Sequence, residues 1–133
     1  MIYVLDTNIA AAALNLHPAV TSRLAQLVPS DVGFSLIVVG ELLYGARKSQ
    51  RVAENLARVE ALRARFPVLP ISDAVMERYA VVRAGLGKLG RPKGDFDLLI
   101  AATAVEHSAV LVTNDAGLKD GTIDGLTVED WLA

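Results

Sequence analysis

The sequence predicts an α/β domain in which helices cover both faces of a mostly parallel central sheet. Short apolar runs that fit buried strands alternate with longer segments of helical periodicity. The helical segments outnumber the strands, and no linker, repeat or low-complexity tract interrupts the alternation. We therefore expect residues 1–133 to form a single domain with three layers, α/β/α.

The predicted strands are short and apolar. Residues 2–5 form a run that ends at Asp6, Thr7 and Asn8, and residues 110–113 form the clearest strand of the chain. Three further runs are strand candidates: 32–34, 68–69 and 126–128.

The predicted helices begin at residues that favour helix starts. Pro18 is suited to the first turn of a helix that continues to Leu27, and Ser35 is placed to cap a helix over residues 36–48. The other expected helices are 7–14, 51–65, 72–89 and 95–107. Gly85, Gly87 and Gly90 fit the spacing of a dinucleotide-binding loop, but a helix precedes them where that loop needs a strand, so we interpret them as a helix end.

The composition excludes cysteine-based sites and limits where nucleic acid or a membrane could be contacted. The chain has no cysteine, so disulfides and thiolate metal sites are excluded. Its 13 Lys and Arg against 15 Asp and Glu do not form a basic domain, so any contact with nucleic acid must come from a local patch. The first residues lack the basic region of a signal peptide, and no apolar run approaches the roughly 20 residues of a membrane helix. We expect a cytoplasmic protein that does not enter a membrane.

Four acidic residues from separate segments are the candidate site. Asp6 and Asp115 follow predicted strands, Glu41 lies in a helix that is otherwise apolar, and Asp97 lies in the first turn of a helix. Ligands bind at the carboxyl ends of strands in open α/β sheets, so the four carboxylates can converge there. Clustered carboxylates repel one another, and Mg²⁺ or Mn²⁺ would relieve the repulsion and promote hydrolysis of a phosphate ester.

Each aspartate also has a structural interpretation. Asp6 could cap the first helix, Asp115 could form an Asx turn, and Asp97 could favour a helix start through the helix dipole. Glu41 has no such role, because a charge in an apolar helix is costly unless it is paired or bound. Asp95 lies two residues from Asp97, about 200° around the helix, so both cannot face one metal. We assign Asp97 to the pocket and Asp95 to the N-cap.

Five segments carry a resemblance to a known family. The sequence resembles the PIN-domain ribonucleases, and within them the VapC toxins of bacterial toxin–antitoxin pairs, in order and over essentially the whole chain. The segments are Tyr3–Asn8, Ser35–Gly45, Asp97–Ala104, Leu111–Asp115 and Gly125–Trp131.

The resemblance implies a PIN-like fold and Mg²⁺- or Mn²⁺-dependent endonucleolytic cleavage of RNA, with tRNA or rRNA as the substrate. It implies that Asp6, Glu41, Asp97 and Asp115 bind the metal and carry the catalysis, and that Asn8 and Thr113 orient water or the carboxylates. It also implies inhibition by a small cognate antitoxin.

Excess apolar surface on residues 36–62 would suit an amphipathic antitoxin segment in a groove. An Arg or Lys of its tail could then pair with the carboxylates. The same helices are candidates for a homodimer contact.

Basic residues flank the candidate site in the sequence. They are either solvated helix ends or contacts to the RNA backbone, which the acidic pocket alone would repel. They are Arg47, Lys48, Arg51, Arg83, Lys88, Arg91 and Lys93.

Two other functions remain as alternatives. The chain could be a catalytically inactive PIN-like module that binds RNA or protein. It could also be a Mg²⁺-dependent phosphatase, although such an enzyme of the haloacid-dehalogenase type needs an Asp where Asn8 stands.

Overall fold

A five-stranded sheet forms the centre of the computed structural model, which describes residues 1–133. All neighbouring strands pair in parallel, in the order β3-β2-β1-β4-β5. Val4 of β1 pairs with Gly33 on one side and with Leu111 on the other. The strands are β1 (Tyr3–Leu5), β2 (Val32–Ser35), β3 (Val68–Leu69), β4 (Val110–Val112) and β5 (Thr127–Glu129).

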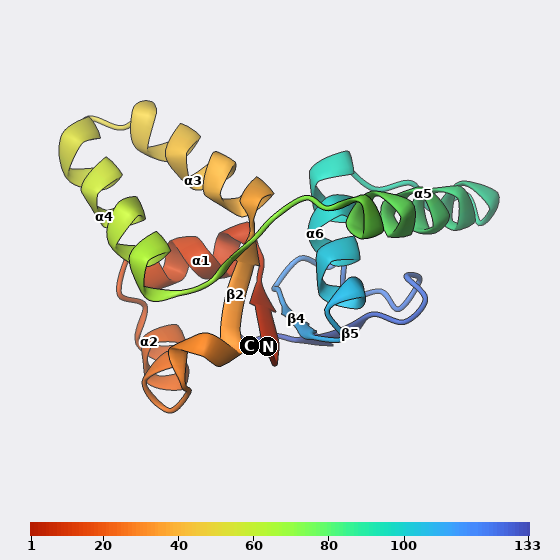
Figure 1. The fold of residues 1–133 in the computed structure, drawn as a ribbon, viewed down its shortest axis with the longest axis horizontal. Coiled ribbons are helices and arrows are strands. Elements are labelled where there is room, and N and C mark those ends of the chain that lie inside the picture. Colours follow the sequence, from red (N-terminus) through yellow and green to blue (C-terminus); the bar gives the residue numbers. More distant parts are fainter.

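Helices cover both faces of this sheet, which confirms the predicted three-layer α/β class. Helices α1 to α4 lie to one side of the strands, and α5 packs on α6 at the other side (Figure 1). A short 3-10 turn, Pro29–Asp31, separates α2 from β2. The helices are α1 (Thr7–Leu14), α2 (Pro18–Ala25), α3 (Leu36–Arg47), α4 (Val52–Arg65), α5 (Asp73–Lys88) and α6 (Asp95–Glu106).

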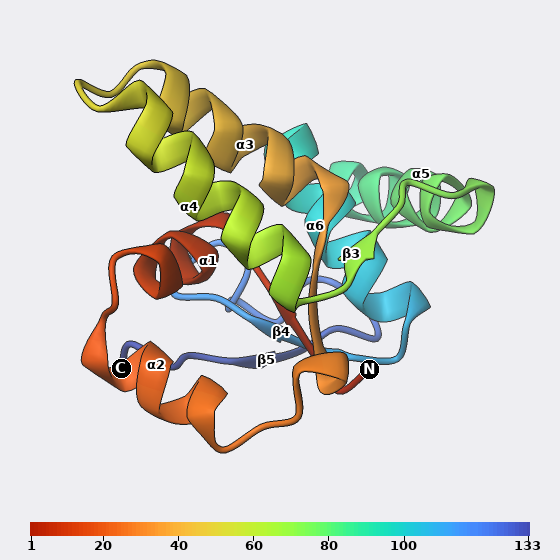
Figure 2. The same cartoon turned by 60° about the vertical axis from the view of Figure 1, so that its left-hand side comes forward.

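The order of the strands reverses next to β1. The chain proceeds from β1 outward to β2 and β3, and then returns through α5 and α6 to place β4 on the free side of β1. Figure 2 shows the long return from β3 to the α5–α6 pair. The carboxyl ends of β1 and β4 therefore meet at a topological switch point, where open α/β sheets bind their ligands.

The core lies between the sheet and the helix layers. A cluster of 29 buried apolar residues includes Val4, Phe34, Ile100 and Leu111, each with 0% of its surface exposed. Gly33 allows β2 to pack closely, since a Cβ atom there would lie 2.9 Å from the carbonyl oxygen of Pro67. None of the helices has the length and apolar character that crossing a membrane requires.

Helix boundaries follow the predicted signals, with small differences. The Ser35 hydroxyl accepts a hydrogen bond from the Ile37 amide at 3.1 Å, which confirms the cap of α3. Helix α2 ends at Ala25 rather than Leu27, and Pro29, which disfavours helix at the residue before it, opens the 3-10 turn. Gly90 has a φ of +66° just after α5, so the glycines at 85–90 are a helix end.

Candidate active site

A small polar pocket brings together the four acidic residues singled out in the sequence. Its volume is about 130 Å³, and no apolar side chain lines it. The carboxylates come from the end of β1, from α3, from the first turn of α6 and from the loop after β4. The lining residues are Asp6, Thr7, Asn8, Glu41, Asp97 and Asp115.

Asp6 is the most buried of the four, with 5% of its surface exposed. Its Oδ1 accepts the Ile9 amide at 3.0 Å and caps α1, and its Oδ2 accepts the Thr113 hydroxyl. Burial raises the pKa of Asp6, and the nearby Asp97 and Asp115 raise it further, against the lowering by these hydrogen bonds. Asp6 thus fills its structural role as a helix cap and still lines the pocket.

Glu41 lies in the second turn of α3 and faces the start of α1. The Thr7 hydroxyl donates a hydrogen bond to Glu41 Oε1 at 2.6 Å. Thr7 therefore supplies the hydrogen-bond partner that the apolar residues of α3 cannot offer to the Glu41 carboxylate. Glu41 is only half-buried and lines the pocket, and no hydrogen bond within the protein engages its second carboxylate oxygen.

Asp97 and Asp115 complete the pocket from the other side. Burial raises the pKa of Asp97, and the charges of Asp115 and Glu41 add to this effect, whereas Lys93 opposes it. Asp115 Oδ1 accepts the Gly117 amide at 2.9 Å, so the expected Asx turn is present. This turn holds the carboxylate of Asp115 at the pocket.

The chemistry of the pocket fits a hard divalent cation. The lining offers carboxylate, hydroxyl and amide oxygens and no sulfur or imidazole, which is the donor type that Mg²⁺ and Mn²⁺ prefer. Burial is the main cause that raises the pKa of Asp6 and of Asp97, and the neighbouring carboxylates add to it; a bound cation would offset both effects. No group of three or more acidic or histidine side chains is preassembled as a chelating cluster.

Asp95 does not have the role predicted for it. The N-cap of α6 is Gly94, and Asp95 is the first residue of the helix, without a capping hydrogen bond. Its Oδ1 accepts the Tyr79 hydroxyl at 2.8 Å and lies 3.3 Å from Arg83 Nη1. The side chain is held by α5 instead, because Tyr79 and Arg83 offer it a hydroxyl and a charge.

Several of the flanking basic residues are already engaged within the protein. Arg83 pairs with Asp95, and Lys48 lies 5.0 Å from the centre of the Tyr44 ring. Lys93 is bound to Asp120 and only 9% of its side chain is exposed, so it is not a solvated helix-end charge.

Two polar neighbours of the site were not assigned a role from the sequence. Thr7 holds Glu41, and Asn114 Oδ1 accepts a hydrogen bond from Asn8 Nδ2 at 3.3 Å. Both residues stand beside assigned ones, Thr7 next to Asp6 and Asn114 next to Asp115. The sequence feature that could have identified them is their position directly after a predicted strand.

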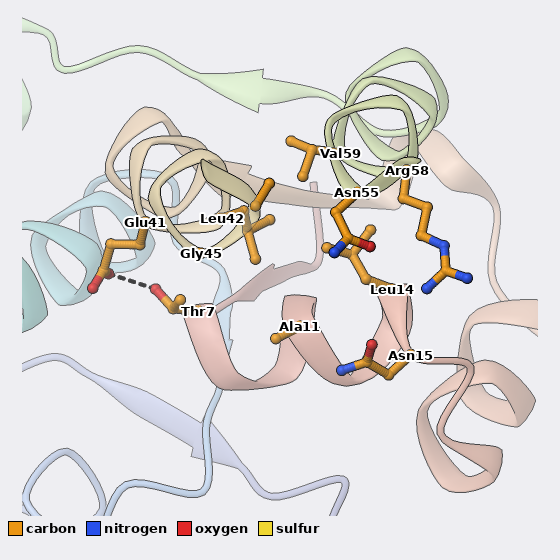
Figure 3. Close-up of a pocket in the computed structure, with 11 residues that line it drawn as sticks. Thr7, Ala11, Leu14, Asn15, Glu41, Leu42, Gly45, Asn55, Arg58 and Val59 are labelled. Atoms are coloured by element: carbon orange, nitrogen blue, oxygen red, sulfur yellow. Dashed lines mark hydrogen bonds between the residues drawn. The ribbon is translucent and has the colours of Figure 1, made fainter. Parts of the chain in front are cut away.

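A second, larger cleft adjoins the acidic pocket. It has a volume of about 270 Å³ and lies between α1, α3 and α4, as the close-up in Figure 3 shows. Thr7 and Glu41 line both hollows, so the hydrogen bond between them stands at the boundary. Leu14 and Val59 give the cleft an apolar part, and Arg58 gives it a positive charge.

Comparisons with known proteins agree with this fold. The sequence model of the PIN domain family matches residues 3–122. The tRNA(fMet)-specific endonuclease VapC of Shigella flexneri is 35% identical over 129 residues, 97% of each chain. Ribonuclease VapC2 of Rickettsia felis is 34% identical and covers 98% of each chain. The chain therefore belongs to the PIN-domain family and, within it, to the VapC ribonucleases.

Solved structures of toxin–antitoxin complexes share the fold. The DNA-bound VapBC complex of Salmonella typhimurium superposes with a TM-score of 0.91, at 33% identity over 98% of each chain. The VapBC2 complex of Rickettsia felis, bound to a promoter DNA fragment, gives 0.89 at 34% identity over 98% of this chain and 99% of that one.

Proposed function

We propose that this protein cleaves RNA endonucleolytically in the cytoplasm, with Mg²⁺ or Mn²⁺ held by Asp6, Glu41, Asp97 and Asp115, and that it is the toxin of a toxin–antitoxin pair. The observation that carries the proposal is the convergence of four carboxylates in one polar pocket at the sheet's switch point. Membership of the VapC ribonucleases supports the reaction class. It argues against the inactive-module and phosphatase alternatives.

The side chains of the pocket have different roles in this proposal. A bound divalent ion would supply an activated water at neutral pH and offset charge on the scissile phosphate. Asp6 is fixed by Ile9 and Thr113, and Glu41 by Thr7, so these two carboxylates are oriented before substrate binds. Asn8 lies at the exposed rim, where its amide can orient the phosphate or a water.

Transfer RNA is the substrate class to test first, with rRNA second. The Shigella flexneri relative is named for cleavage of tRNA(fMet), and its match covers almost all of this chain. Lys88, the last residue of α5, and Arg91, in the loop after it, are exposed and would offer positive charge to the RNA backbone.

We further propose that a small antitoxin occupies the cleft between α1, α3 and α4. An amphipathic segment would place apolar side chains against Leu14 and Val59. From there a basic side chain can pass the Thr7–Glu41 contact and pair with the carboxylates, in competition with the metal. The solved relatives that share the fold are VapBC complexes, which supports a partner of this kind.

A different face of α3 is available for a homodimer. Leu36, Gly40 and Tyr44 are exposed and recur every four residues, which places them in one stripe along the helix. Together with the exposed Phe96 they line an apolar hollow of about 490 Å³. A twofold contact through this stripe would leave the antitoxin cleft free.

The deciding experiment is cleavage of a tRNA pool by the purified chain. We expect cleavage with Mg²⁺ or Mn²⁺, none in EDTA, and recovery when metal is returned. Asp6→Asn should fold and fail to cleave. Robust cleavage in chelator would overturn the metal proposal, and a folded protein that binds tRNA without cutting it would favour the inactive module.

A further inference from the structure

Lys93 is a largely covered side chain whose charge acts on Asp97 of the acidic pocket. It lies in the loop before α6, and its Nζ donates a hydrogen bond to Asp120 Oδ2 at 2.7 Å. With only 9% of its side chain exposed, Lys93 would be costly to bury without a charged partner. Asp120 is more open, with 24% of its side chain exposed, so the pair lies at the surface while the side chain of Lys93 is covered.

Asp120 is itself held in place. Its Oδ1 accepts the Thr122 amide at 3.0 Å and the Thr122 hydroxyl at 2.6 Å. The hydrogen bond from Lys93, followed by those from Thr122, keeps the pKa of Asp120 well below its usual range. Asp120 is thus ionised near neutral pH and carries the charge that pairs with Lys93.

The two segments that this pair joins each carry a carboxylate of the site. Lys93 lies four residues before Asp97, and Asp120 lies five residues after Asp115 in the loop that follows β4. Residues 114–126 form no strand or helix, so no ladder fixes Asp115 relative to α6. Leu118 and Ile123 anchor this loop in the core, and the Lys93–Asp120 pair is the ion pair that joins it to the segment just before α6.

We propose that Lys93 and Asp120 are positioning residues that hold the Asp115 loop against the start of α6 and so set the separation of Asp97 and Asp115. Neither residue lines the acidic pocket, so both act through the two carboxylates. The proposal deepens the metal-dependent cleavage proposed above and rests on it for its effect on rate.

The same loop contains a matched control. Lys119 Nζ donates a hydrogen bond to Asp130 Oδ2, also at 2.7 Å, but this pair ties the loop to the C-terminal segment. Removing it breaks an ion pair of equal length without releasing the link to α6. Lys119→Met and Asp130→Asn therefore report the general effect of losing a charge pair from this loop.

Three variants test the proposal. Lys93→Met removes the charge and the pair, Asp120→Asn weakens the pair but keeps the charge of Lys93, and Lys93→Arg keeps both. Displacement of reacting groups by about 1 Å can cost on the order of 100-fold in rate. We expect Lys93→Met and Asp120→Asn to lower kcat roughly 10- to 100-fold, to raise the Mn²⁺ concentration for half-maximal rate, and to leave KM for RNA nearly unchanged. Lys93→Arg and the control variants should stay near wild type.

Amide hydrogen exchange of residues 115–122 in EDTA supplies a measurement that needs no cleavage. Exchange should accelerate in Lys93→Met and Asp120→Asn and remain slow in Lys93→Arg and both controls. Unchanged exchange in the first two variants, or equal acceleration in the controls, overturns the positioning role. If the wild type cuts no RNA while the exchange pattern appears as expected, the proposed function fails and the link between the segments stands.

Discussion

Asp6 and Asp97 are ionisable groups whose surroundings favour the protonated form. Burial raises the pKa of both above the ordinary value of 3.8, and neighbouring carboxylates add to the rise. The folded state therefore binds these protons more tightly than the unfolded state does. Without metal, this contribution stabilises the protein at low pH and is lost as pH rises from about 4 through the raised pKa values.

Substitution of Asp97 by Asn should separate stability from activity. The amide cannot ionise, so metal-free Asp97→Asn should have a higher midpoint of urea unfolding than wild type at pH 7. The difference should shrink as pH falls toward 4, because a growing fraction of the wild-type carboxyl is then protonated. RNA cleavage should be lost at every metal concentration. A less stable variant at pH 7 would contradict the assigned repulsion.

Asp95→Asn is the matched control in the same helical turn. Asn retains an oxygen that can accept the Tyr79 hydroxyl, and only the exposed pair with Arg83 is lost. Exposed pairs contribute about 0–1 kcal/mol, so the change in the free energy of unfolding should be small. Most cleavage activity should remain in a tRNA assay. Loss of activity in Asp95→Asn with retention in Asp97→Asn would reverse the assignment.

Helix α3 presents two faces with different proposed partners, and a glycine lies on each. A Cβ atom at Gly40 or Gly45 would meet nothing within 4 Å, so a side chain can be added at either position without a clash. Glycine in a helix interior costs roughly 0.5–1 kcal/mol relative to alanine. Gly40→Gln and Gly45→Gln should therefore fold at least as well as the wild type.

The two variants should separate the two interfaces. Gly45 lines the cleft between α1, α3 and α4, so Gly45→Gln should weaken antitoxin binding at least about tenfold, or 1.4 kcal/mol. Gly40 lies in the apolar stripe, so Gly40→Gln should weaken the homodimer instead. Calorimetric titration and sedimentation measure the two effects. Equal effects of both variants on both assemblies would mean that the interfaces overlap.

The positions of most strands and helices could be predicted because each signal is local. Ser35 caps α3 through its own neighbour Ile37, and the apolar run of β4 needs no knowledge of its partner. Asp95 was misassigned because its partners, Tyr79 and Arg83, come from another helix. The residue types on distant segments can be read from the sequence, but which of them come into contact cannot.

A divalent ion should stabilise the folded molecule as well as activate it. An ion that binds only the folded state at 100 times its Kd adds about 2.7 kcal/mol to the free energy of unfolding. We expect Mn²⁺ to raise the wild-type melting temperature in calorimetry, with a smaller rise in Asp6→Asn. Equal shifts in both proteins would place the ion elsewhere.

The convergence of the carboxylates could be predicted from a rule about open α/β sheets. The carboxyl ends of the strands at a switch point lie at one edge of the sheet, where ligands bind. The pairing of Thr7 with Glu41 and of Lys93 with Asp120 could not follow from it. Those pairs depend on the exact separation of α1 from α3 and of a loop from α6, which packing determines. The sequence therefore indicated that the four carboxylates of the candidate site come together, but not the contacts that hold them.

The placement of β4 beside β1 also determines when during synthesis the pocket can exist. Asp6 is translated 107 residues before its hydrogen-bond partner Thr113, and its neighbour Asp115 follows two residues after Thr113. A growing chain that has reached α5 has Asp6 and Glu41 but neither Asp97 nor Asp115. The proposed nuclease site can thus assemble only after the segment that contains Asp115 has been translated, and until then the ribosome that makes this protein is not exposed to a complete set of the four carboxylates.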